Sequence, residues 1–206
     1  ALTQGEMADG LKQALDQGVN HAVDQLGQPG GFLNDARVRI PMPEKLKWID
    51  STLRKVGKDD LADEFVQSMN HAAAQAVPEV ATVFGDAIRD MSLDDARGIL
   101  SGPDDAATEY FRTHSSSALV ERMQPIIEQA TSKAGVTSRY KAMTDKANRF
   151  SGGLLGGKSV DIDSYVTQKA MDGLFVMIAE QEKLIRENPL QRSTDLLQKV
   201  FGSVKP

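Results

Sequence analysis

Apolar residues recur every three or four positions along most of the chain. From Leu11, the positions Leu15, Val19, Val23 and Leu26 follow one side of a helix. No long run alternates apolar and polar residues, and aromatic residues make up only 5% of the chain, so strand signals are nearly absent. The pattern predicts an all-α fold, a helical bundle of about eight to ten helices.

A connector is expected after the first helix. Gly27 and the run Pro29-Gly30-Gly31 stop that helix, and each residue that precedes a proline in Ile40-Pro41-Met42-Pro43 is restricted to extended backbone. Residues 27–43 are therefore predicted to form a Pro-rich connector. Pro43 suits the first turn of a second helix, which Gly57 ends.

Further helices follow from the same spacing. A third begins at Asp59 or Asp60, and Pro78 either kinks it or starts a fourth that runs to Met91. Ser92 with Asp95 predicts a capping box at the start of a short helix. The serines at 115–117 are a candidate break in the next helical stretch.

The last third of the chain contains a Gly-rich loop and the strongest helix. Residues 151–160 hold four glycines without periodicity and predict a flexible loop. Asp161 or Asp163 caps the broad apolar helix that follows, and Asn188-Pro189 ends it. A final helix carries Leu196, Leu197, Val200 and Phe201.

Length and composition define the class of protein. A chain of 206 residues with 40% hydrophobic and 26% charged residues is expected to fold as one helical domain, 1–206. Its net charge of −5 opposes nucleic acid as a partner. No apolar stretch approaches the roughly 20 residues that cross a bilayer, and no cysteine is available for disulfides or thiolate chemistry.

One segment fits a nucleotide-binding pattern. Residues 152–159, Gly-Gly-Leu-Leu-Gly-Gly-Lys-Ser, match the phosphate loop, which joins a buried strand to a helix. The preceding residues, 139–150, form a charged helical pattern, and Asp161 and Asp163 lie where phosphate would bind. Because this context is wrong, we interpret the segment as a loop.

Other chemical motifs are sparse. His21, His71 and His114 are scattered without metal-ligand spacing, and the acidic pairs at 59–60, 94–95 and 104–105 fall where helix caps are expected. No metal or other cofactor is predicted. The segment 183–206 is locally basic, so its helix either packs on the core or docks on an anionic membrane or an acidic partner.

Several segments together resemble the bacterial domain-of-unknown-function family 4197, whose members are usually made with a secretion signal. The resemblance is most specific in the tail, where residues 185–189 lead into 194–197 and 200–202. It also involves residues 10–15, 31–33 with 38–41, 64–65 with 68–70, 106–108 with 110–111, and 172–175. It implies an exported, periplasmic helical protein, and we expect that a signal peptide was removed before Ala1.

The resemblance also directs attention to polar residues in the matching segments, either as a shared binding site or as the residues that hold helix junctions together. These residues are Asn70, Thr108, Tyr110, Arg186, Arg192, Thr194 and Asp195. Arg186 and Arg192 are in addition candidates for buried ion pairs beside Asn188-Pro189.

Two functions from different classes remain. The first is a non-enzymatic binding protein of the bacterial envelope, in which helices form a groove for a lipid-like or other amphiphilic ligand or for an envelope protein's apolar segment. The alternative is a hydrolase or transferase with a carboxylate-based site assembled across helices, which requires a carboxyl of raised pKa in a cleft. The sequence does not specify the ligand or the oligomeric state.

Overall fold

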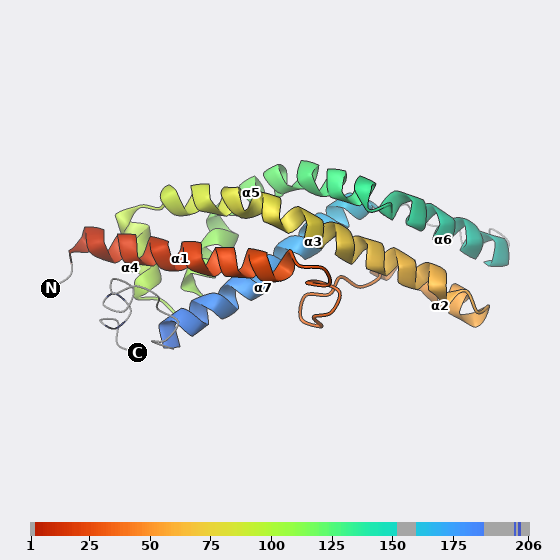
Figure 1. Cartoon of the computed structure of the whole chain (residues 1–206), viewed down its shortest axis with the longest axis horizontal. Coiled ribbons are helices and arrows are strands. Elements are labelled where there is room, and N and C mark those ends of the chain that lie inside the picture. Colours follow the sequence, from red (N-terminus) through yellow and green to blue (C-terminus); the bar gives the residue numbers. More distant parts are fainter. Residues whose placement is uncertain (1–2, 152–159, 188–199, 201, 203–206) are drawn as a thin grey trace. The chain divides into compact units, whose positions relative to one another are not determined.

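The computed structural model describes residues 3–151, 160–187, 200 and 202. These residues form seven α-helices and one short 3-10 helix, with no strand among them, so the all-α prediction is confirmed (Figure 1). The elements are α1 (Gln4–Leu26), η1 (Glu44–Leu46), α2 (Lys47–Lys55), α3 (Asp59–Arg89), α4 (Leu93–Leu100), α5 (Ala106–Lys133), α6 (Val136–Ser151) and α7 (Ile162–Glu187). The predicted Gly-rich loop and final helix fall largely outside the described residues.

The chain divides into two compact units. The first comprises residues 1–25, 79–122 and 174–206, and the second comprises 26–78 and 123–173. Helices α3, α5 and α7 therefore each contribute residues to both units. The assignment of 1–206 to one domain stays a prediction.

Aromatic rings form the centre of the first unit. Phe84 of α3 packs edge-on against Phe111 of α5 and Phe175 of α7, with ring centroids 5.9 Å and 6.2 Å apart. Phe84 and Phe111 are fully buried, and the Arg112 guanidinium lies 4.8 Å from the Phe175 ring centroid. Edge-to-face pairs add to the free energy gained by burying apolar surface. These contacts join three helices through residues distant in sequence.

The connector, residues 27–43, contributes side chains to the core of the second unit. Residues 27–43 contain no helix, as predicted, and their Phe32 and Ile40 side chains are fully buried. The Asn70 amide holds this segment, because its Oδ1 accepts from Ile40 N at 2.8 Å and its Nδ2 donates to Ile40 O at 2.9 Å. A buried amide thus satisfies two backbone groups that have no helical partner.

Two helices run through expected interruptions. Pro78 lies inside α3, which continues to Arg89, and the serines at 115–117 lie inside α5. Burial explains the continuity, since Val77 and Val80 flank Pro78, and Phe111 and Leu119 flank the serines, all with their side chains in the core. Packing of the apolar face outweighs the local helix-breaking tendency.

Substitution of Gly173 tests how closely the connector packs against α7. A Cβ at this position would lie 2.9 Å from Phe32 Cε1 and 3.3 Å from Val38 Cβ. We expect Gly173→Ala to lower the free energy of unfolding by about 1–3 kcal/mol, because the connector must shift. Gly85→Ala is the control, since its Cβ would meet nothing within 4 Å. That change should raise stability by about 0.5–1 kcal/mol in urea unfolding. Equal effects would contradict the close packing.

Candidate functional site

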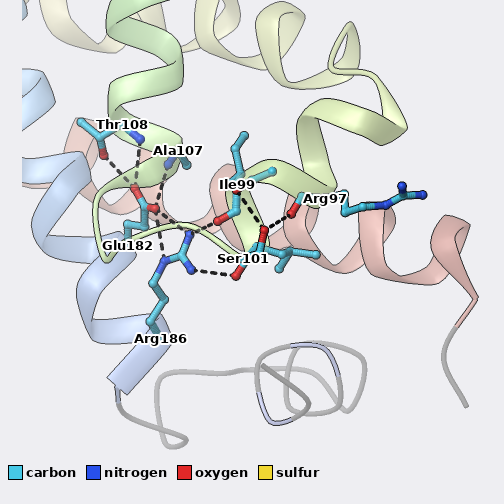
Figure 2. Close-up of polar contacts among 9 residues, drawn as sticks. Arg97, Ile99, Ser101, Ala107, Thr108, Glu182 and Arg186 are labelled. Carbon is cyan, nitrogen blue, oxygen red and sulfur yellow. Dashed lines mark hydrogen bonds and ion pairs between the residues drawn. The ribbon is translucent and has the colours of Figure 1, made fainter. Parts of the chain in front are cut away.

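The carboxylate of Glu182, near the end of α7, caps helix α5. Its Oε1 accepts hydrogen bonds from Thr108 N at 3.0 Å and Thr108 Oγ1 at 2.9 Å, and its Oε2 accepts from Ala107 N at 2.9 Å (Figure 2). Amides in the first turn of a helix have no intrahelical acceptor, and negative charge is favoured there. Glu182 therefore provides from another helix what an N-cap residue usually provides locally.

Arg186, one turn further along α7, joins Glu182 to helix α4. Its Nε and Nη2 donate to Glu182 Oε2 at 3.3 Å and 3.0 Å, and Nη2 also donates to Ile99 O at 2.8 Å (Figure 2). Its Nη1 lies 3.4 Å from Leu100 O. The last carbonyls of a helix favour a cation. The pair thus links the end of α4 to the start of α5.

Burial makes this pair important. The side chains of Glu182 and Arg186 are only 4% and 9% exposed, and their i, i+4 spacing places both on one face of α7. Moving a charged side chain out of water costs several kcal/mol unless a partner and hydrogen bonds compensate it. Here Glu182 and Arg186 compensate each other. In addition, the Glu182 carboxylate faces the positive end of α5, and the Arg186 guanidinium faces the negative end of α4.

The opposite end of α4 is also held by polar contacts. Ser92 and Asp95 form the predicted capping box, with Asp95 N donating to Ser92 Oγ at 3.0 Å and Ser92 N to Asp95 Oδ2 at 3.1 Å. Tyr110 of α5 donates its hydroxyl to the same Oδ2 at 3.0 Å and stacks on His114. The Ser92 hydrogen bonds lower the pKa of Asp95, while burial raises the pKa of Tyr110.

A surface groove lies between α1 and α4. The floor and walls come from α1 and α4, where Leu93 is 51% exposed and Arg97 is exposed. The groove residues are Gln4, Met7, Ala8, Leu93, Ala96, Arg97 and Leu100. Its hollow measures about 20 Å³, which admits roughly one water-sized group. We call this surface the α1–α4 groove.

A second hollow lies against the buried pair. Leu11, Leu15 and Gly18 of α1 line it together with Glu182 and Arg186 of α7, and its volume is about 10 Å³. Pockets for drug-sized molecules occupy about 300–1,000 Å³. Neither hollow is large enough to enclose such a molecule.

The residues selected from the sequence fall into three groups. Thr108 and Arg186 meet on Glu182, whereas Tyr110, two residues after Thr108 on α5, contacts Asp95 of α4. Asn70 belongs to the other unit, where it holds the connector. Arg192, Thr194 and Asp195 lie outside the described residues, so the proposed ion pair of Arg192 is not addressed. The buried ion pair expected for Arg186 is present.

Sequence reasoning missed Glu182. A signal was available, because Glu182 lies four residues after Ile178 and three before Ile185, on the apolar stripe of α7. A charged residue on such a stripe must find partners in the core. The acidic residues expected at the start of α5, Asp104 and Asp105, do directly precede its first residue, Ala106, and are exposed.

Carboxylate chemistry finds little support in this geometry. Five donors occupy the two oxygens of Glu182, which leaves the carboxylate poorly placed to take a proton from a substrate. Burial raises the pKa of Asp16, but Asp16 lines neither hollow. Within residues 3–151, 160–187, 200 and 202, no cluster of His, Asp or Glu is arranged to hold a metal ion.

Comparison with known proteins identifies the family. Residues 1–202 of the chain match the family model described as protein of unknown function (DUF4197). The chain is therefore a member of this family, as its tail motif indicated. The searches of curated proteins and of solved structures found no match. None of the described helices is long and apolar enough to span a membrane.

The buried pair predicts strongly coupled mutational effects. Glu182→Gln and Arg186→Met should each lower the free energy of unfolding by about 3–5 kcal/mol, because each leaves a buried charge without its partner. The double variant should cost less than the sum of the two, by about 0.5–3 kcal/mol. Urea unfolding of all four proteins measures this cycle. Additive losses would show that the two side chains act independently.

The capping box predicts a dependence on pH. Because the pKa of Asp95 is lowered from 3.8 in the folded protein, its contribution is present above 3.8 and is lost as the pH falls through the lower, folded-state pKa. Asp95→Asn should flatten the corresponding part of the stability profile. Thermal unfolding from neutral to strongly acidic pH measures it, and Asp94→Asn on the same helix is the control. An unchanged profile in Asp95→Asn would contradict the assignment.

Proposed function

We propose that this chain is a non-catalytic interaction protein of the bacterial envelope. In this proposal the α1–α4 groove binds an apolar, acidic segment of a partner protein. The observation that carries the proposal is the exposed Leu93 side chain beside an apolar hollow, on a helix that other helices hold at both ends.

The positioning of α4 supports a binding role. An isolated helix of eight residues is unstable in water, so α4 depends on its neighbours. Tyr110 fixes its first turn through Asp95, and Arg186 fixes its last turn through Ile99 and Leu100. A binding surface on rigid, pre-positioned elements loses less conformational entropy when a partner binds.

The size of the groove favours a protein segment over an enclosed ligand. A hollow of about 20 Å³ accepts a methyl-sized group, such as the end of an apolar side chain, but not an alkyl chain. Leu93 can then cover the inserted side chain from the edge of the groove. A peptide segment also supplies further apolar contacts along α1 and α4.

Charge supports an acidic partner segment. Arg97 lies in the groove wall and is exposed, and among the described residues no carboxylate is within salt-bridge distance of it. A carboxylate placed beside Arg97 would form a charge-assisted hydrogen bond, in either a single or a bidentate geometry. The family resemblance supports the envelope as the site of action.

A peptide-display selection against the purified chain tests the proposal. We expect enrichment of peptides that combine an apolar residue with a nearby Asp or Glu. Leu93→Asp and Arg97→Glu should each weaken the selected peptides by at least about tenfold. The control is Val176→Asp, since Val176 is 40% exposed in the same unit but lies outside the groove.

Two results would overturn this proposal. One is peptide binding that does not depend on the groove chemistry, seen either as enrichment without acidic residues or as binding that survives both groove substitutions. The other is an amphiphile that co-purifies with the chain, detected by native mass spectrometry and lipid extraction, and that Leu93→Asp removes. The second result would assign the groove to a lipid-like ligand instead.

A further inference from the structure

A basic helix pair lies in the second unit. Helix α2 packs against α6, and Figure 1 places both beside the beginning of α3. Residues 44–58, which include η1 and α2, hold five basic and two acidic residues, while α6 holds four basic residues and one acidic residue, Asp145. The chain as a whole carries −5, so this local excess of positive charge opposes the overall balance.

Most of these positive charges are not neutralised. Among the described residues, six basic side chains of the pair have no carboxylate within salt-bridge distance. They are Lys45, Lys55, Lys58, Lys141, Lys146 and Arg149. All of them except Lys146 are exposed, and Lys146 is half-buried beside the Phe150 ring.

Three nearby acidic residues are already engaged, whereas Asp145, one turn from both Lys141 and Arg149 on α6, is in no ion pair among the described residues. Arg54 pairs with Asp50 and Asp63, at 3.0 Å and 2.8 Å. Arg139 pairs with Glu64 at 3.1 Å. These two arginines compensate carboxylates of α2 and α3, and the lysines are left to define the surface potential of the pair.

An aromatic residue adds an apolar contact to this surface. Phe150, in the last turn of α6, is 49% exposed, and Lys146 Nζ lies 5.8 Å from its ring centroid. A partly exposed aromatic ring beside lysines is the arrangement by which interfacial helices contact lipid headgroups and the acyl boundary. A nucleic-acid backbone, by contrast, would bind only the lysines and would leave Phe150 without a role.

We propose that the basic helix pair of α2 and α6 docks on the surface of an anionic phospholipid bilayer. The lysines and Arg149 bind lipid phosphates by electrostatic attraction, and Phe150 inserts at the headgroup level. Nucleic acid is the less favoured partner, because the acidic remainder of the chain would repel a long phosphate backbone. This docking is independent of the α1–α4 groove.

Vesicle sedimentation with the full chain tests the proposal. The chain should bind phosphatidylcholine vesicles containing about one-third phosphatidylglycerol, and it should not bind pure phosphatidylcholine. Raising the salt from about 0.1 M to 0.5 M should release it, since screening shortens the range of the attraction. Lys141→Glu combined with Arg149→Glu should weaken binding by at least about tenfold.

Matched variants separate this surface from others. Arg97→Glu combined with Lys183→Glu makes the same change in charge on exposed residues of the first unit and should leave vesicle binding intact. Phe150→Ser should weaken binding severalfold at each salt concentration. Circular dichroism confirms that every variant is folded.

Three outcomes would overturn the proposal. They are equal binding to neutral vesicles, loss of binding in the Arg97 and Lys183 control but not in the α6 variant, and binding to duplex DNA without binding to anionic vesicles. The second outcome would move the docking surface to the first unit. The third would assign the basic pair to nucleic acid.

Discussion

The ion pair between Glu182 and Arg186 is the contact on which the first unit depends. Two adjacent helix ends, the last turn of α4 and the first turn of α5, carry opposite partial charges and lack intrahelical partners. One buried acid and one buried base from a single turn of α7 satisfy both ends at once. The corner between α4 and α5 therefore depends on a helix that is about 75 residues further along the chain.

This arrangement gives polar residues of the helical core a structural role. A catalytic carboxylate needs a free lone pair directed at a substrate and a pKa suited to proton transfer. Glu182 is surrounded by amide, hydroxyl and guanidinium donors, and Asn70 is used in the same structural way on the connector. In both units, buried polar side chains hold irregular backbone and helix ends.

The sequence predicts the parts of this fold that are local. The capping box of Ser92 and Asp95, the non-helical connector and the end of α2 shortly before Gly57 each follow from a few adjacent residues. The family resemblance points to Thr108 and Arg186 as candidate site residues, but it does not point to Glu182, which binds both of them. Glu182 meets Thr108 only after the chain has folded, and no short-range pattern encodes a cap supplied from another helix. Pro78 was ambiguous for the same reason, since tertiary packing decides whether the helix continues.

Net charge shows how an average conceals the distribution that matters for binding. Residues 79–122 hold nine acidic residues and four basic ones, whereas α6 has the opposite excess. A protein with a net charge of −5 can therefore present a positive surface within the Debye length of about 10 Å over which exposed charges act. Whole-chain charge argues against wrapping a long polyanion, which contacts much of a protein's surface. It does not argue against a flat anionic bilayer, which contacts only the face that is turned towards it.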